Sequence, residues 1–242
     1  MFSKELLFLA IVVGFATAKV PDYIHVCGAK NPHLDECIIK SVEALAPKLR
    51  NGIPEFDIPP TDPLIIGTVK LTDIPNIQAT GSDVKLHGLD VYHIDFLHMD
   101  LEKQTLDVVL RYDKIQMDAS YSVTAKILVP ISGEGPINLS ADNVLVKVHM
   151  KYSIIERNGK KYMYFSSMKT QLDVKDFTAK FEASNVDKTL QEAITQALGS
   201  SHQEILEATK PNLERFISQM CLDSANKICK HFTFDELFPD RE

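Results

Sequence analysis

A helical repeat of apolar residues runs through the last part of the chain, from Asp187 to His231. The apolar positions recur at spacings of three, four, seven and eight, which keeps them on one face of a helix. Pro211 removes a backbone donor and clashes with the preceding turn, so we expect a kink or a short break there. Because the helical repeat of apolar residues continues in step across Pro211, we expect two co-linear helical segments packed on one surface. Together they would span about 65 Å.

The middle of the chain, from Leu64 to Glu182, follows a period of two instead. In its clearest run, Ile115 to Ile131, nine alternate positions are apolar and most residues between them are polar. As one strand this run would be about 55 Å long, which matches the helix. Between Tyr112 and Lys114 the alternation slips by one, which indicates a bulge, a turn or a strand boundary.

Two short segments between the alternating runs predict turns. Ser132-Gly133-Glu134-Gly135 is expected to turn the chain after the long strand, and Asn158-Gly159 is a strong two-residue hairpin signal. Strands joined by tight turns form an antiparallel meander. A long, twisted sheet with one apolar face can curl around a long amphipathic helix, which buries both apolar surfaces. We therefore predict an α+β fold in which a curved antiparallel sheet wraps around a C-terminal helix.

The first residues have the features of a secretory signal. Lys4 precedes an apolar run from Leu6 to Phe15, and Ala16-Thr17-Ala18 fits a cleavage site. The run is too short to cross a membrane, and the sequence has no later apolar stretch of about 18 residues. We expect residues 1–18 to be removed and residues 19–242 to form a single secreted, extracellular domain with no integral membrane segment.

One helix and one irregular segment are predicted between the signal and the sheet. The residues from Leu34 to Arg50 place their apolar side chains on one helical face, and Asn51-Gly52 is expected to end the helix as a left-handed cap. Four prolines between Gly52 and Leu64 exclude a helix and a central strand. We expect an extended surface connection there.

The four cysteines fall into two pairs with different expectations. Cys27 and Cys37 are close in sequence, and a disulfide between them would contribute about 3 kcal/mol in the chain-entropy model. Eight residues of helix would hold Cys221 and Cys229 about 12 Å apart, beyond the reach of a disulfide. Unless the helix ends early, they are expected to be buried free thiols; zinc is the weaker alternative, since His231 is the one further ligand nearby.

Charge and motifs exclude several classes of function. The net charge of −7 argues against a nucleic-acid partner and against an electrostatic membrane anchor. The chain has neither a Gly-x-Ser-x-Gly motif nor a phosphate-binding glycine loop, so we expect neither an enzyme nor a cofactor.

Some polar residues remain as candidates for other roles. His87, His93 and His98 lie near Asp95 and Asp100, but their spacing matches no known metal-ligand pattern, and we predict no metal site. Exposed strand residues are the simpler interpretation, and a role for His93 or His98 in binding a ligand head group stays open. Asn138-Leu139-Ser140 is an acceptor sequence for N-glycosylation, which we predict at Asn138.

Three features together resemble the insect takeout and juvenile hormone-binding protein family. They are the spacing of Cys27 and Cys37, the segment from Gly52-Ile53-Pro54-Glu55 through Ile58-Pro59-Pro60 to Asp62-Pro63-Leu64, and the ending Phe234-Asp235-Glu236-Leu237-Phe238-Pro239. The resemblance covers essentially the whole mature chain. No cysteine lies between Cys37 and Cys221, which resembles the takeout branch.

The resemblance implies a secreted carrier with a super-roll fold, similar to the lipid-binding modules of bactericidal/permeability-increasing protein. Such proteins enclose an elongated apolar cavity for juvenile hormone, fatty-acid-like or isoprenoid molecules, and their N-terminal cysteine pair is disulfide-bonded. A signalling or protein-interaction module of the same fold is the alternative, and a hormone-ester hydrolase is a third. We expect a monomer, and the sequence leaves a receptor open.

Binding in such a cavity comes from shape and apolar area, with adaptable methionines and a few tyrosine hydroxyls that orient a ligand oxygen. The predicted cavity residues are Met117, Tyr121, Val123, Ile127, Val129, Val148, Met150, Tyr152, Tyr164, Met168, Phe216 and Met220.

Overall fold

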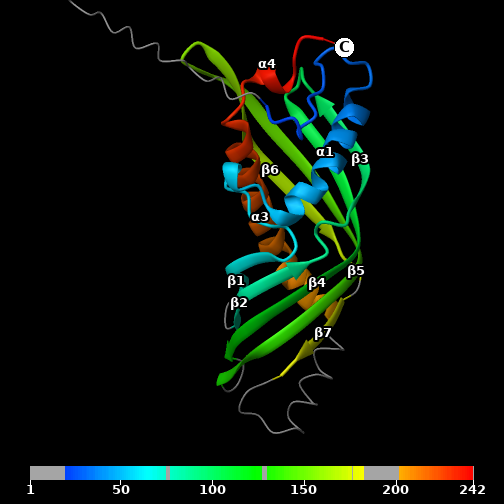
Figure 1. Ribbon diagram of the computed structural model, residues 1–242. Helices are drawn as coiled ribbons and strands as arrows, with labels where there is room; N and C mark the ends of the chain where they lie inside the picture. Colours follow the sequence, from blue (N-terminus) through cyan, green and yellow to red (C-terminus); the bar gives the residue numbers. More distant parts are fainter. Residues whose placement is uncertain (1–19, 75–76, 127–129, 176, 183–201, 242) are drawn as a thin grey trace, which may run out of the picture.

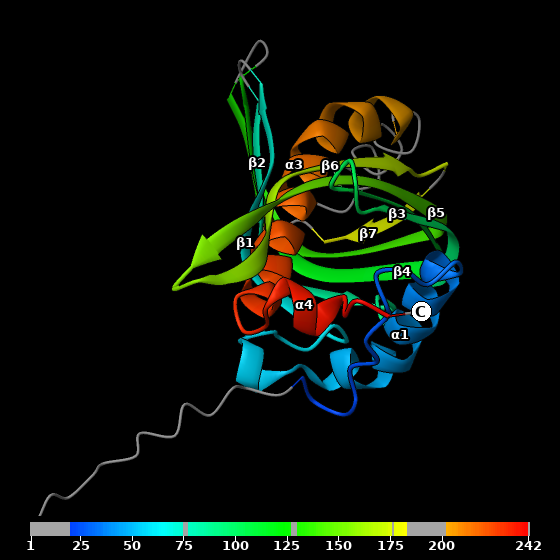
Figure 2. The same ribbon diagram turned by 90° about the horizontal axis from the view of Figure 1, so that it is seen from above.

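The protein is an antiparallel sheet rolled around an apolar interior, with a long helix closing its side (Figures 1 and 2). The computed structural model describes residues 20–74, 77–126, 130–175, 177–182 and 202–241. The predicted signal at 1–18 and the first part of the predicted C-terminal helix lie outside these ranges. The helices are α1 (Leu34–Asn51), the 3-10 helix η1 (Pro54–Phe56), α3 (His202–Cys229) and α4 (Phe234–Leu237).

The sheet of the described chain has seven strands in the order β1-β2-β4-β5-β6, with β3 paired to β4 and β7 paired to β5. Every pairing is antiparallel, as the alternating pattern predicted. The strands are β1 (Leu64–Ile74), β2 (Ile77–His87), β3 (His93–Asp100), β4 (Thr105–Lys126), β5 (Pro130–Arg157), β6 (Lys160–Asp173) and β7 (Phe177–Phe181).

Two strands are far longer than usual and form the spine of the sheet. β4 has 22 residues and β5 has 28, and they pair in one register from Thr105↔Lys151 to Lys126↔Pro130. The turn predicted at Ser132–Gly135 is therefore wrong, because these residues lie inside β5. The glycines have a different role there. A Cβ at Gly135 would collide with the carbonyl oxygen of Glu182, so glycine permits close approach of the chain that follows β7.

The slip predicted near Tyr112 is real, but it neither ends a strand nor shifts the register. Asp113 and Lys114 are both exposed on β4, and so are Asp142 and Asn143 on β5. The pairs Tyr112↔Val144 and Lys114↔Asp142 keep the same register on either side. At this level each strand thus switches the set of positions that faces the interior, between odd-numbered and even-numbered residues. Asn143 has a φ of 53° there. The apolar face continues through the change.

The hairpin predicted at Asn158-Gly159 is confirmed. β5 ends at Arg157 and β6 begins at Lys160. Asn158 and Gly159 have φ values of 51° and 72°. Positive φ at both central residues is the type I′ arrangement, whose twist matches that of the flanking strands.

Helix α3 is continuous through Pro211, so a break there is wrong, and the predicted helix is confirmed from His202 to Cys229. It lies along the free edge of β6 (Figure 1). Side chains of α3 bond the unpaired backbone groups of that edge. Asn226 accepts from the N–H of Phe165 at 2.8 Å and donates to its carbonyl at 2.9 Å. Ser218 accepts from Thr170 N–H at 3.1 Å, and Glu214 accepts from Leu172 N–H at 2.8 Å.

Helix α1 is confirmed, but its ending and the segment after it differ from the predictions. Gly52 has a φ of 80° and a ψ of 164°, which is not a left-handed helical cap. The proline-rich segment is not an extended surface connection. It folds back on itself, with backbone hydrogen bonds of 2.9 and 3.1 Å between Ile53 and Ile58. Ile53, Phe56 and Ile58 are buried with Phe232 in a small core of their own. The expectation that the prolines exclude a helix is also wrong, because Pro54 begins the 3-10 helix η1, and proline is tolerated in a first helical turn.

Candidate ligand-binding interior

The largest cluster of buried residues lies toward the end of the roll that holds α1 and α4. Six buried residues contact one another there: Met99, Met150, Tyr152, Met163, Phe165 and Cys229. They come from β3, β5, β6 and α3, so the curvature of the sheet brings together positions far apart in sequence. Methionine makes up half of this cluster, and its flexible thioether adapts to irregular shapes.

A second cluster continues the apolar interior along β5. Val144, Val146 and Leu172 are buried, and Leu213 and Ile217 of α3 pack against them. The inward positions of β4 are half-buried both beside this cluster and past it, where they are Ile115, Met117, Ala119, Tyr121 and Val123. The apolar stripe therefore runs on past the two clusters of buried residues.

One hydroxyl in this interior has no hydrogen-bond partner. Tyr152 is 3% exposed, and its Oη is one of three buried side-chain polar atoms without a partner among the described residues. Burial, together with the Asp100 carboxylate, raises the pKa of Tyr152 to about 12, so the hydroxyl keeps its proton at neutral pH. A buried hydroxyl left unbonded costs about 1–3 kcal/mol. Tyr152 thus offers a donor to any molecule that enters with an acceptor oxygen.

Four of the predicted cavity residues lie in or against the first cluster, and five others are half-buried. Met150 and Tyr152 belong to the first cluster, and Val148 and Met168 pack against it. Met117, Tyr121 and Val123 occupy the half-buried inward positions of β4, and Phe216 and Met220 are half-buried on α3. Ile127 and Val129 lie outside the described residues.

Tyr164 does not line the interior. It is 44% exposed and lies on the outer face of β6, between the buried Met163 and Phe165. The register of β5 and β6 shifts between Lys151 and Tyr152, and this shift is why the prediction chose the wrong residue. Phe165 was missed for the same reason. The adjacent exposed residues Ser166 and Ser167 are the sequence signal that could have revealed the irregularity.

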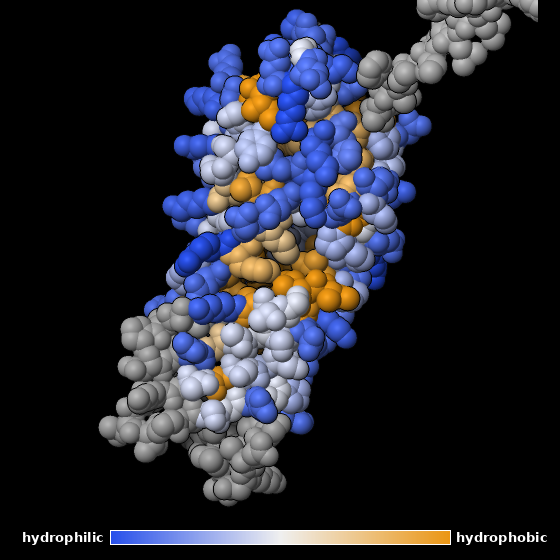
Figure 3. Space-filling model, turned by 90° about the vertical axis from the view of Figure 1, so that its left-hand side faces the viewer, coloured by the Kyte–Doolittle hydropathy of each residue, from blue (hydrophilic) through white to orange (hydrophobic). Residues whose placement is uncertain are grey.

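On the side of the roll where α3 and β1 lie, hydrophobic residues gather at mid-height, and hydrophilic residues predominate in the upper part (Figure 3). Ile65 of β1 is 66% exposed.

An open hollow of about 570 Å³ lies between the N-terminal segment and the C-terminal tail. Val20, Ile24, Asp235 and Arg241 are among its lining residues, and none of the predicted cavity residues is.

Cys221 and Cys229 are confirmed as free thiols; Cys229 is buried as predicted, and Cys221 is half-buried. Burial raises the pKa of the Cys229 thiol to about 12 and holds that of Cys221 above its ordinary value. Both therefore stay protonated and act as small apolar groups at neutral pH.

The histidines considered as ligands or head-group contacts are on the outside. His93 and His98 have side chains that are 50% and 52% exposed. His98 Nδ1 lies 2.9 Å from Asp35 Oδ2, and this partner holds the pKa of His98 above its ordinary value. His87 lies 3.1 Å from Asp62. Each imidazole is thus engaged by a carboxylate on the surface.

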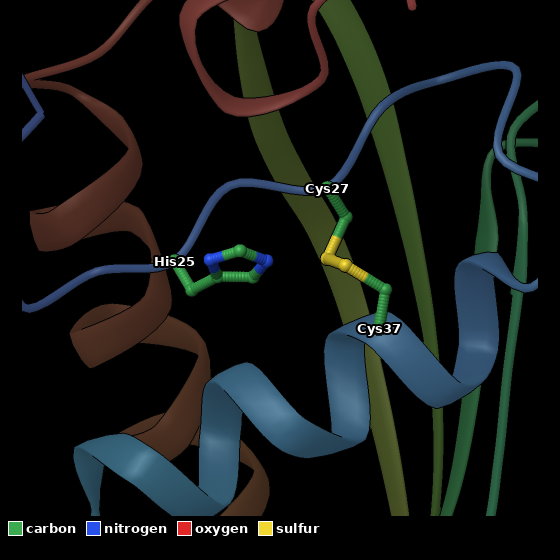
Figure 4. Close-up of side chains that lie close together, drawn as sticks. All are labelled: His25, Cys27 and Cys37. Carbon is green, nitrogen blue, oxygen red and sulfur yellow. A yellow bond between two sulfur atoms is a disulfide. The ribbon is translucent and has the colours of Figure 1, made fainter. Parts of the chain in front are cut away.

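The disulfide between Cys27 and Cys37 is confirmed. His25 lies beside it, and these three side chains form the one group in the described part of the chain with the proximity of a metal site (Figure 4). Because both sulfurs are bonded to each other, they are not available as thiolate ligands.

The predicted glycosylation site is accessible. Asn138 is exposed on β5, and its Nδ2 donates to Asp118 Oδ1 at 2.6 Å. No helix in the described residues is long and apolar enough to cross a membrane.

Comparisons with known proteins agree with this architecture. Takeout 1 of Epiphyas postvittana superposes with a TM-score of 0.66 at 22% identity, over 86% of this chain and 93% of that protein. A desert locust protein (Schistocerca gregaria) named "Putative beta-carotene-binding protein" is 22% identical over 222 residues, which is 90% of this chain and 89% of the relative. The "Circadian clock-controlled protein daywake" of Drosophila melanogaster is 22% identical over 219 residues, or 84% of each chain.

The decisive comparison is with whole protein families. The model of the haemolymph juvenile hormone binding protein family matches residues 6–239, which is nearly the entire chain. The takeout-like resemblance of the cysteine pair, the proline-rich segment and the C-terminal motif is thereby confirmed. The protein belongs to the haemolymph juvenile hormone binding protein family, whose members bind hydrophobic ligands.

Proposed function

We propose that the protein is a secreted carrier that holds one elongated apolar molecule in its interior, with an acceptor oxygen of that molecule bonded to Tyr152. The single observation that supports this most directly is the unpaired hydroxyl of Tyr152 inside an otherwise apolar cluster. Buried polar groups in folded proteins are nearly always bonded, so an orphan donor points to a partner that arrives later.

The apolar surroundings favour the class of ligand. Methionine and aromatic side chains surround Tyr152, and the half-buried stripe on β4 extends the same surface. Each buried methylene of a ligand contributes about 0.8 kcal/mol. A chain with one oxygenated end, such as an isoprenoid ester, a quinone or a fatty-acid derivative, suits this arrangement. The name of the locust relative, which mentions a carotene, fits an apolar cargo of this shape.

Export fits the same proposal. A disulfide persists in oxidising surroundings, and the Cys27–Cys37 bond is consistent with removal of residues 1–18 during secretion. Native mass spectrometry of protein from a secreting eukaryotic host tests both parts. A mass that begins near residue 19 and carries a stoichiometric apolar ligand is expected. An empty protein that binds neither quinones nor long-chain esters would favour the interaction module instead.

Tyr152→Phe tests the role of the hydroxyl. Without ligand, the variant is expected to be more stable by about 1–3 kcal/mol, because a buried unbonded donor is removed. Its affinity for a long-chain methyl ester is expected to fall about fivefold, as for the loss of one hydrogen bond. Affinity for the alkane of equal length should not change. Titrations with both probes and urea unfolding measure these effects.

Tyr164→Phe is the matched control, because this tyrosine lies on the outer face of the next strand. It should alter neither stability nor affinity. Equal affinity of the Tyr152→Phe variant and the unaltered protein for the ester would remove Tyr152 from the site.

A further inference from the structure

The β5–β6 hairpin carries a row of basic side chains on its outer face. Five exposed residues make up this basic strip: Lys147, Lys151, Arg157, Lys160 and Lys169. The tip of the hairpin projects beyond the rest of the roll in both ribbon views (Figures 1 and 2). The strip is therefore reachable by a large partner.

The register places these cations on one side of the hairpin. Lys147, Lys151 and Arg157 are odd-numbered positions of β5, opposite in direction to the buried Val146, Met150 and Tyr152. Across the pairing, Arg157 lies beside Lys160, and Lys169 lies beside His149. Along β5 the strip extends about 33 Å, at 3.3 Å per residue.

Negative charge is nearly absent from this surface. Glu156 is the one carboxylate between residues 147 and 171, and it occupies an even-numbered position opposite Lys161. The nearest carboxylate on the adjoining strand is Asp107, which is engaged by His149 at 2.7 Å. None of the five cations has a carboxylate oxygen within 4.0 Å in the part of the chain that the structure describes.

The strip contrasts with the charge of the whole molecule. The chain carries a net charge of −7, which by itself argues against an anionic partner. Charge is not evenly distributed over the molecule, however. At physiological salt, electrostatic interactions between exposed charges are largely screened beyond about 8 Å. A flat partner that meets the outer face of the hairpin therefore encounters positive charge.

Aromatic residues lie within the strip. Tyr164, 44% exposed, is paired with Ser153, and Tyr162 is paired with Ile155 on the same face. Tyrosine rings with an apolar body and a polar tip are favoured at the boundary between lipid and water. The combination of spaced lysines with exposed tyrosines is suited to a lipid surface more than to a pocketed protein partner.

We propose that the basic strip docks the protein on bilayers that contain anionic phospholipids. The lysines contact the phosphate and carboxylate groups, and Tyr164 enters the interfacial layer. This extends the proposed carrier function, because an apolar cargo must be taken from or delivered to a membrane. The docking itself does not depend on the cargo.

Sedimentation with vesicles tests the proposal. The full mature protein is expected to bind vesicles of phosphatidylcholine with phosphatidylserine, and to bind phosphatidylcholine alone much more weakly. Each basic side chain strengthens binding to an anionic bilayer roughly fivefold. The triple variant Lys147→Thr, Lys151→Thr, Lys169→Thr should therefore bind on the order of 100-fold more weakly. High salt should abolish the difference.

A matched control removes three other exposed strand lysines: Lys85→Thr, Lys114→Thr and Lys180→Thr. It has the same composition and net charge as the triple variant, and it should bind vesicles as well as the unaltered protein. Circular dichroism checks that both variants are folded.

The outcomes are distinct. Equal weakening by both triple variants would show that net charge, not the strip, governs binding, and would overturn the proposal. So would binding to heparin without binding to anionic vesicles, which would indicate a polyanion or an acidic protein. A protein that docks but never contains an apolar ligand would leave this proposal standing and overturn the carrier function.

Discussion

At the scale of single residues, Asn143 lies where the alternation of inward and outward side chains is interrupted. At one level, the long strands β4 and β5 both switch between odd-numbered and even-numbered residues facing the interior. Asn143 makes this switch possible on β5. Its φ of 53° is in the left-handed region, which asparagine tolerates better than most residues. At the same level of β4, Asp113 and Lys114 are both exposed, which accommodates the change.

Asn143→Val should therefore lower the free energy of unfolding by about 1–2 kcal/mol, because a β-branched residue is poorly tolerated at positive φ. Asn143→Gly should stay within about 0.5 kcal/mol of the unaltered protein. Urea unfolding measures both values. Asp142→Val is the control, since this exposed neighbour does not have a positive φ. If Val and Gly at position 143 gave the same stability, the switch between odd-numbered and even-numbered inward positions would not depend on this residue.

At the scale of elements, helices protect the edges of the sheet. An exposed edge strand presents unpaired backbone groups that invite other strands. Glu214, Ser218 and Asn226 of α3 bond the edge of β6, and Asp35 of α1 accepts from the N–H of Met99 on β3 at 2.8 Å. The same arrangement explains why these polar residues lie on the sheet-facing sides of the helices, which are otherwise apolar.

Asn226→Ala tests the contribution of one such contact. Loss of the side chain leaves both the N–H and the carbonyl of Phe165 without their partner, so the free energy of unfolding should fall by about 1–3 kcal/mol. Chemical unfolding followed by far-ultraviolet circular dichroism measures the change. Gln219→Ala is the control, because Gln219 donates to Asp223 on the exposed side of the same helix. A result for Asn226→Ala no larger than for this control would show that the edge is satisfied by water.

The sequence could predict the elements whose signals are local. The hairpin at Asn158-Gly159 and the helix from Leu34 follow from short-range turn chemistry and periodicity. The turn at Ser132–Gly135 was predicted wrongly because glycine has two uses. It marks turns, but it also permits close packing of one chain against another, and only the tertiary structure distinguishes them.

The interior was partly predictable for a related reason. Alternation places Val148, Met150 and Tyr152 on one face correctly. On β6 it fails beyond the register shift opposite Lys151 and Tyr152, where Phe165 is buried and Tyr164 is exposed. Burial of the proline-rich segment depends on Phe232, which lies far along the chain, so no local pattern could reveal it.

At the scale of the whole molecule, the two ends of the described chain are tied together. The N–H of Ala29 donates to the carbonyl of Pro239 at 2.8 Å, and Lys30 Nζ lies 2.7 Å from Asp240. The disulfide fastens the same N-terminal segment to α1. Because α1 packs on the methionine-rich cluster, this assembly covers one end of the apolar interior.

Replacing Cys27 and Cys37 together by alanine should therefore have two effects. The free energy of unfolding should fall by about 3 kcal/mol, because the unfolded chain regains the freedom of a loop closed over ten residues. Hydrogen exchange should rise in residues 20–50 before it rises in β5, since the cover loosens while the sheet stays paired. Replacement of Cys221, a free thiol, is the control and should not affect exchange in residues 20–50. Uniform loss of protection across the sheet would mean that the disulfide stabilises the roll as a whole and not its covered end.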